Sequence, residues 1–379
     1  MCAMKKKEKN KSHILYRITS ILLLSFILVS CEPFTSAPTI KAAETITESA
    51  SVNTASVPAI PALPAVFQSR YSNPLDTPHT YIQDSCVYLA NRWNRLNSEP
   101  GTVVMILMLQ DIVTTQVGDS GNASNIYISD LRKILDQLKF QGFEAINTKQ
   151  LLDFMERNVK IPPRSVLIIQ DGSHRLENYD KSFREYWVRW GWPVVNGWVS
   201  STNLSDEIWA ENIALENEGF IDHQAQGVTE GTLLSDDSSK IVIARELKGP
   251  IDPFIDQFRK NPIALIWPNG GFGQRPVVAA RQLDYQLGFT SNSRGPVMYN
   301  WVPLANEFDP ERPTYIPEGT LNDPLMTLPR YWPREALNAI DKVRITGEEA
   351  KAYAEASKAA EFEYYRIVCE PTYGPMPTP

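Results

Sequence analysis

Short apolar segments alternate with amphipathic segments through the middle of the chain. Residues 103–109 (VVMILML) and 165–169 (SVLII) are continuously apolar and have the length of strands, whereas residues 129–141 and 148–157 repeat apolar side chains at helical spacing. Further strands are predicted at 193–199, 220–223 and 263–267, and further helices at 180–189, 205–218, 241–259 and 275–287. Apolar strands that alternate with helices predict parallel βαβ units and a sheet covered on both faces.

A glycine followed by an aromatic residue ends four of the predicted helices. The pairs are Gly142–Phe143, Gly191–Trp192, Gly219–Phe220 and Gly288–Phe289. Glycine adopts the left-handed conformation at a helix C-terminus without a Cβ clash, and the aromatic residue then begins the next buried strand. Both an open doubly wound sheet and a barrel fit this pattern. No glycine-rich phosphate loop follows the first strand, which argues against a nucleotide-binding open sheet.

The first 30 residues have the organisation of an export signal. Lysines crowd residues 1–11, and residues 18–30 form an uncharged apolar segment that is too short to span a bilayer. The sequence Leu-Val-Ser-Cys that ends at Cys31 resembles the bacterial lipoprotein box, which implies cleavage before Cys31 and its lipidation; a plain secretory signal is the alternative. We therefore expect a signal peptide over 1–30, an extracytoplasmic location and an N-terminal lipid anchor in a membrane.

The composition changes again after the predicted signal. Residues 31–80 are rich in Thr, Ser, Ala and Pro and are predicted to be a disordered tether. Cys86 and Cys369 then remain near the two ends of the globular region, where an oxidising compartment favours a disulfide; two buried free thiols are the alternative. Without residues 1–30 the net charge falls from -7 to -12, which argues against nucleic-acid binding.

Polar residues follow the predicted strands in an order that resembles the polysaccharide deacetylase family, carbohydrate esterase family 4. The resemblance covers about residues 101–295. It is carried by GTVVMILMLQDI, KIPPRSVLIIQDG, LENEGFIDHQAQG and NPIALIWPNGGFGQRPVVAARQLDYQLGFTSN. It implies a distorted TIM-type (β/α)7-8 barrel over residues 81–295. Residues 296–379, rich in proline and with a helix predicted over 348–365, are expected to be an extension packed on the same domain.

The family holds a divalent metal with one aspartate and two histidines, and a second aspartate is its general base. By the resemblance, Asp171 matches the metal aspartate and His223 the first metal histidine. The second histidine position is Gly227, and the general-base position is Gln170, whose amide has no usable basicity. No histidine follows His223, so His174 is the one candidate for a third ligand.

We therefore expect a surface-anchored lipoprotein that binds a cell-wall or exopolysaccharide glycan, with deacetylase chemistry lost or impaired and with no cofactor. Trp267, Asn269 and Gln170 are the predicted glycan-binding residues, because they lie at strand ends. The alternative is an active polysaccharide deacetylase with one divalent metal such as Zn. A third interpretation is a glycoside hydrolase that uses Asp171 with a second strand-end carboxylate.

Overall fold

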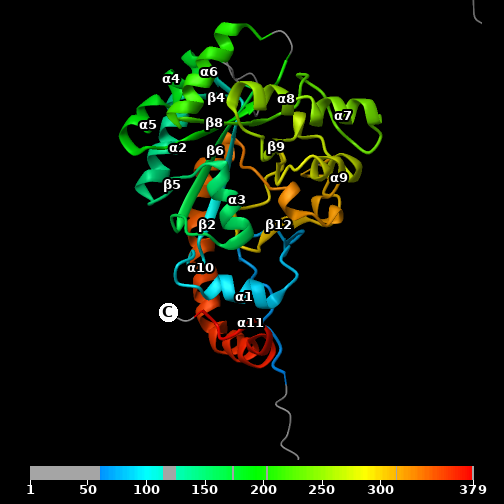
Figure 1. Ribbon diagram of the computed structural model, residues 1–379. Coiled ribbons are helices and arrows are strands. Elements are labelled where there is room, and N and C mark those ends of the chain that lie inside the picture. The colour runs from blue at the N-terminus through cyan, green and yellow to red at the C-terminus, as the bar shows by residue number, and fades with distance from the viewer. Residues whose placement is uncertain (1–59, 114–124, 173–174, 202–203, 313, 378–379) are drawn as a thin grey trace, which may run out of the picture. The chain divides into compact units, whose positions relative to one another are not determined.

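The computed structural model describes residues 60–113, 125–172, 175–201, 204–312 and 314–377 (Figure 1). Six parallel strands lie side by side in the order β2 (Val103–Leu109), β6 (Arg164–Asp171), β7 (Val194–Trp198), β8 (Ile221–Ala225), β9 (Ala264–Ile266) and β10 (Leu287–Phe289). Neighbours in this sheet follow one another along the chain, as right-handed βαβ units require. Five of these strands, β2, β6, β7, β8 and β9, were predicted from their apolar runs; β10 begins at Leu287, where the predicted helix over 275–287 was expected to end.

Helices connect these strands and cover the sheet (Figure 1). They are α2 (Ile128–Phe140), α3 (Thr148–Arg157), α4 (Leu176–Ser182), α5 (Arg184–Trp190), α6 (Asp206–Glu218), α7 (Lys240–Lys248), α8 (Ile251–Pro253) and α9 (Gln274–Gln282). The predicted helix over 241–259 is interrupted where Gly249 and Pro250 follow α7, and it continues as α8 and a π-helical turn at Phe254–Phe258. The predicted helix over 180–189 is divided at Phe183 into α4 and α5.

Residues 328–331 close the sheet into a distorted barrel. The amide of Leu328 donates to the carbonyl of Gly288 in β10 at 2.8 Å, and the amide of Tyr331 donates to the carbonyl of Ile106 in β2 at 2.8 Å. One short segment is thus hydrogen-bonded to both edge strands. The predicted barrel is confirmed, but it extends beyond the predicted boundary at residue 295, because part of the expected extension completes the ring.

The pleat of the sheet divides its side chains between two apolar layers. Val104, Ile106, Leu167, Ile169 and Val195 belong to the inner layer, which α3 also lines. Met105, Leu107, Val166, Ile168 and Val194 belong to the outer layer beneath the surrounding helices. Residues that pair across parallel strands share a face, and successive residues alternate between faces. The side chain at position 170 therefore belongs to the outer face and the side chain at position 171 to the inner face.

Shorter strands and turns accompany the barrel sheet, some of them in separate two-stranded sheets. These are β3 (Asp111–Val113) paired with β4 (Asn125–Tyr127), β5 (Glu144–Ala145) paired with β6, β11 (Val297–Met298) antiparallel to β2, β12 (Val302–Ala305), and 3-10 turns at Pro268–Gly270, Glu318–Leu321 and Pro324–Met326. Within the described residues, no helix is long and apolar enough to cross a membrane. The predicted signal peptide and Cys31 lie outside the described residues.

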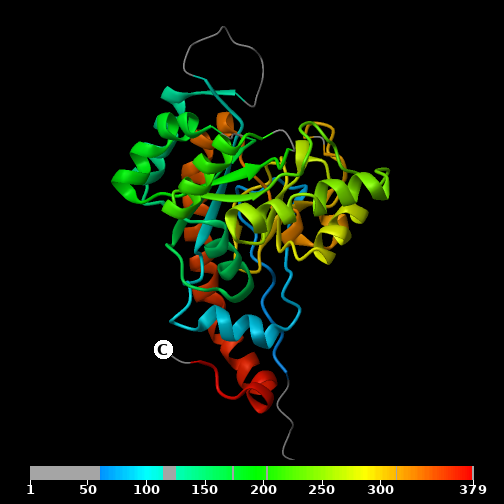
Figure 2. The same ribbon diagram turned by 45° about the horizontal axis from the view of Figure 1, so that its top comes forward.

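Residues 60–80 pack on the domain instead of belonging to the predicted tether. β1 (Asp76–His79) pairs antiparallel with β12, and the indole of Trp301 donates to the carbonyl of Phe67 at 2.8 Å. Residues with such partners are ordered, so the predicted tether does not extend to residue 80. Residues 31–59 of the predicted tether lie outside the described residues. The C-terminal helix is also longer than predicted: α10 (Pro333–Tyr364) runs along β2 and past the barrel, where α1 (Ser85–Trp93) crosses it (Figure 2).

A disulfide joins Cys86 in α1 to Cys369, which lies between α10 and α11 (Glu370–Tyr373), with Cα atoms 5.4 Å apart. This is the pairing that the sequence favours. Both cysteines are buried in a small apolar cluster with Leu89, Trp93 and Tyr365. The disulfide spans 283 residues of sequence and holds α1 against the end of the chain.

Replacing Cys86 and Cys369 by serine should lower the free energy of unfolding by on the order of 4 kcal/mol. The disulfide reduces the conformational entropy of the unfolded chain, and the variant lacks this restriction. Denaturant unfolding of the oxidised protein and of the double variant measures the difference. A reducing agent should lower the midpoint of the natural chain and leave that of the variant unchanged. Equal midpoints for the two oxidised proteins would contradict a stabilising disulfide.

Candidate functional site

Two adjoining cavities, which we call the barrel mouth, open where the parallel strands end. One has a volume of about 500 Å³ and extends toward α4, and the other has a volume of about 260 Å³ and extends toward the loop after β9. They share Gln110, Asp111, Asp171 and Gly172 as lining residues. In barrels of this type, functional groups gather at the carboxyl ends of the strands, so the mouth is the first candidate site.

Asp171, the predicted metal aspartate, is bound to an arginine of the same chain. Arg330 Nη1 donates to Asp171 Oδ1 at 2.6 Å, and Arg330 Nε donates to the carbonyl of Thr290 at 2.6 Å. The arginine side chain is only 1% exposed. Arg330 comes from the segment that closes the barrel, so a guanidinium neutralises the carboxylate at the bottom of the mouth.

His223, the predicted metal histidine, lies away from Asp171. In the sheet register Gly197 pairs with Asp171 on one side and with Gln224 on the other, so His223 points to the opposite face from Asp171. Its ring is fully buried beneath α6, with Nδ1 2.8 Å from Glu216 Oε2 and Nε2 3.0 Å from Asn212 Oδ1. The structure does not bring the two predicted ligands together, and both ring nitrogens of His223 already have partners.

The contacts of His223 belong to a buried ionic cluster between β8 and α6. Lys260 Nζ lies 2.5 Å from Glu216 Oε1 and 2.9 Å from Asp222 Oδ1. Burial of Glu216 opposes its ionisation, but the hydrogen bond from His223 and the charge of Lys260 outweigh burial and hold the pKa of Glu216 below its usual value. Burial likewise opposes ionisation of Asp222, and Lys260 again overcomes it and lowers the pKa of Asp222. His223 is therefore part of a structural charge network.

Gln170, at the predicted general-base position, lies at the floor of the larger cavity. Its Nε2 donates to the carbonyl of Gln110 at 2.6 Å, which fixes the orientation of the amide. Its Oε1 is buried and has no hydrogen-bond partner in the described part of the chain. Gln170 thus presents an unused acceptor and no group that could remove a proton.

The two other predicted glycan-binding residues differ in position. Trp267 is fully buried, and its indole donates to the carbonyl of Met326 at 2.8 Å, so it is a core residue and does not line the mouth. Asn269 is exposed at the mouth of the smaller cavity, at the turn after β9, with a left-handed φ of 49°. Asn269 and Gln170 therefore remain candidates for ligand contact, and Trp267 does not.

The residues at the mouth do not fit a divalent metal. Asp171 is the only one of the assigned ligands that reaches it, and its carboxylate is occupied by Arg330. His174 lies outside the described residues. Across the described ranges, no three or more His, Cys, Asp or Glu side chains are grouped as metal ligands. We therefore derive no reaction step through a metal.

Sequence reasoning missed Arg330, which contacts Asp171 from the closing segment, and two residues that line the mouth. Arg330 lies in a proline-rich stretch with no strand pattern, and nothing in the sequence predicts that it reaches Asp171. Gln226 and Glu230 line the smaller cavity from the loop after β8. Their position three and seven residues beyond the strand predicted over 220–223 was the available signal, because strand ends gather at the mouth.

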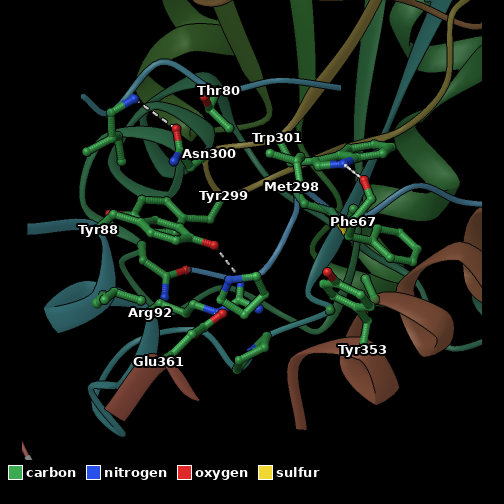
Figure 3. A pocket seen from close by; sticks show the side chains of 18 of the residues that line it. Phe67, Thr80, Tyr88, Arg92, Met298, Tyr299, Asn300, Trp301, Tyr353 and Glu361 are labelled. Atoms are coloured by element: carbon green, nitrogen blue, oxygen red, sulfur yellow. Dashed lines mark hydrogen bonds and ion pairs between the residues drawn. The ribbon is translucent and has the colours of Figure 1, made fainter. Parts of the chain in front are cut away.

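A separate cavity of about 230 Å³ lies at the other end of β2, between residues 63–67, α1 and α10. Figure 3 shows its aromatic lining, which includes Phe67, Tyr88, Tyr299, Trp301 and Tyr353. Tyr88 stacks on Tyr299 with ring centroids 5.7 Å apart, and Arg92 Nε lies 3.1 Å from a carboxylate oxygen of Glu361. None of the residues at the carboxyl ends of the parallel strands lines this cavity, so the barrel mouth remains the candidate site.

Comparison with known proteins shows the fold. No family model matches the sequence, and no curated protein matches it. Among solved structures, the deacetylase PplD of Streptococcus pyogenes in complex with acetate aligns with a TM-score of 0.50 and 16% identity, over 65% of this chain and 99% of that one. At this identity the likeness shows that the chain has a deacetylase-type barrel and leaves its activity open.

Two further structures resemble the chain at a lower level. A polysaccharide deacetylase from Bacillus cereus has a TM-score of 0.47 and 16% identity, over 63% of this chain and 69% of that one. IcaB from Ammonifex degensii has a TM-score of 0.47 and 12% identity, over 65% of this chain and 98% of that one. PplD and the Bacillus cereus protein are both named as deacetylases.

Separating Asp171 from Arg330 should destabilise the chain, because a buried charge loses its partner. Asp171→Asn should lower the free energy of unfolding by about 3 kcal/mol, and the double variant with Arg330→Gln should lose less than the sum of the single variants. Denaturant unfolding of the four proteins gives the coupling. The half-exposed ion pair of Arg281 with Asp323 is the control and should couple by less than about 1 kcal/mol. Equal coupling for the two pairs would contradict a buried Arg330–Asp171 pair.

The ionic cluster should make the fold sensitive to acid. A carboxylate whose folded pKa is depressed contributes stability above its unfolded pKa, about 4, and this stability is lost as the pH falls through the folded pKa. Glu216→Gln should therefore flatten the decline in unfolding free energy below about pH 4, measured by urea unfolding across this range. Glu218→Gln, on the same helix but in an exposed ion pair with Arg184, should leave the decline unchanged. A Glu216→Gln curve parallel to that of the natural chain would refute this role.

Proposed function

We propose that the chain binds a cell-wall or exopolysaccharide glycan at the barrel mouth and does not carry out metal-dependent deacetylation. The observation that carries this proposal is the contact between Arg330 and Asp171. Metal-dependent amide hydrolysis needs a cation with an open coordination position that acidifies a bound water. A guanidinium stays protonated and offers only donors, so it balances the charge of Asp171 without supplying that chemistry.

The other groups at the mouth support the same proposal. Gln170 stands where a general base is needed, and His223 is held on the opposite face by Glu216 and Asn212. A concave site with a few converging polar groups is still suited to binding a ligand. Polar side chains such as Asn269 and Asp111 remain exposed there and could contact sugar hydroxyls.

We also propose that the chain is exported and anchored by lipid at Cys31, so that the mouth faces glycans outside the cytoplasm. The apolar segment before Cys31 supports export, and so does the disulfide between Cys86 and Cys369, because structural disulfides persist in oxidising compartments. Labelling of cells with a radioactive fatty acid should mark the natural chain and leave a Cys31→Ala variant unlabelled. Equal labelling of the two chains would rule out this anchor.

The glycan proposal is tested with partly acetylated glucosamine oligomers and the full chain in detergent. We expect saturable binding by calorimetry that a metal chelator does not change, and no release of acetate with or without added zinc. Asn269→Ala should raise the dissociation constant about fivefold, the value of one hydrogen bond. Asn322→Ala is the matched control, because Asn322 is also exposed and left-handed but does not line the mouth.

Each outcome of this experiment decides between the two interpretations. Acetate release that needs metal and stops with chelator would establish the active deacetylase and overturn the proposal. Absence of binding to the oligomers would also overturn it. Binding that is weakened by Asn322→Ala as much as by Asn269→Ala would place the glycan elsewhere on the chain.

A further inference from the structure

We infer that the barrel mouth recognises protonated amino groups, so that the glycan it binds contains de-N-acetylated amino-sugar units; this inference rests on the proposed function. The reason is an imbalance between acceptors and donors. The described residues that line the two cavities include several oxygen acceptors without a donor, and only one cationic side chain. A ligand that complements this lining must supply hydrogen-bond donors and positive charge.

Two amide oxygens show the imbalance most clearly. Gln170 lines the larger cavity and Gln226 the smaller one, and the Oε1 atom of each is buried without a hydrogen-bond partner in the described part of the chain. The side chain of Gln170 is only 4% exposed, and its Nε2 is already bound to the carbonyl of Gln110. A buried acceptor that lacks a donor costs free energy, so each of these oxygens favours a ligand that donates to it.

The absence of a side chain at Gly197 leaves room for the second amide oxygen, Oε1 of Gln226. A Cβ added to Gly197 would lie 2.3 Å from Gln226 Oε1, so the amide occupies the space that a side chain would take. Gly197 also pairs with Asp171 in the sheet. Gln226 Oε1 therefore lies next to Asp171 on the inner side of the sheet, where the two cavities adjoin.

The carboxylates add negative charge to these acceptors. Asp111 lines both cavities and Glu230 lines the smaller one, and in the described part of the chain neither has an ion-pair partner. Asp171 is balanced by Arg330. The ammonium of Lys181, the one cation among the described lining residues, is paired with Glu177. No cation among the described lining residues is left to compensate Asp111 and Glu230, so a cationic ligand meets unbalanced negative charge at the mouth.

An amino sugar supplies both missing features. A protonated amine offers three N–H donors and one positive charge, whereas an N-acetyl group offers one N–H donor, no charge and a carbonyl that needs a donor itself. Hydroxyl groups, which all sugars share, would not distinguish the two. The chemistry of the mouth therefore favours the free amine over the acetamide.

The test compares two oligomers of equal length, one of glucosamine and one of N-acetylglucosamine, with the full chain at a pH where the amine is protonated. We expect the glucosamine oligomer to bind at least about tenfold more tightly, and Glu230→Gln and Asp111→Asn to weaken it by a larger factor than they weaken the acetylated oligomer. Glu307→Gln is the control, because Glu307 is exposed and does not line the mouth. Raising the pH until the amine loses its proton should abolish the preference.

The outcomes separate this inference from the proposed function. Equal binding of the two oligomers would overturn the inference and leave glycan binding intact, whereas binding of neither would overturn the proposed function itself. An oligolysine peptide of matched charge is the final arm. It should fail to displace the glucosamine oligomer; displacement at the same concentration would show general attraction of cations and would also overturn the inference.

Discussion

The ion pair between Arg330 and Asp171 links the closure of the barrel to the chemistry of its mouth. A guanidinium that is 1% exposed is stable only with a partner, because an unpaired buried charge costs several kcal/mol. Arg330 lies in the segment that bridges β10 and β2, so its hydrogen bonds to Asp171 and Thr290 hold that segment in place across the ring. The ion pair that holds the closing segment across the ring is thus also the contact that binds the Asp171 carboxylate.

The alternation of side chains along the strands decides which polar residues can act together. Gln170 and Asp171 are neighbours in sequence, yet the pleat sends them to different faces. His223 pairs in register with Asn196, which pairs with Gln170, so it belongs to the outer face and packs against Phe258. The sequence motifs identified the correct strands, but a motif does not record which face of the sheet each residue occupies. The two predicted ligands therefore lie on opposite faces and do not meet.

Local signals account for most of the fold that could be predicted. α3 begins and ends where predicted, because Asn147 and Gln150 form a capping box at its N-terminus. The sequence-based helix over 348–365 begins 15 residues after the start of α10, since the prolines before it suggested irregular structure, although Pro333 stands in the first turn where proline is tolerated. The closing segment carries no strand pattern, and its place depends on long-range contacts that a local reading does not contain. The predicted position of Trp267 at the mouth was also wrong. Gly288 has no side chain, so the indole of Trp267 packs inward against the chain.

The pairing of Asp171 with a guanidinium also sets the charge balance that a ligand meets. A divalent cation in the mouth would attract acceptors, such as the carbonyl of an acetamide, and would offset neighbouring carboxylates. Arg330 provides a single charge, and its contact with Asp171 uses it, so Asp111 and Glu230 remain without compensation. In the proposed function, the contact of Arg330 with Asp171 therefore leaves a mouth that favours donors and positive charge. The proposed lack of deacetylase chemistry and the proposed preference for the deacetylated glycan thus have one physical cause.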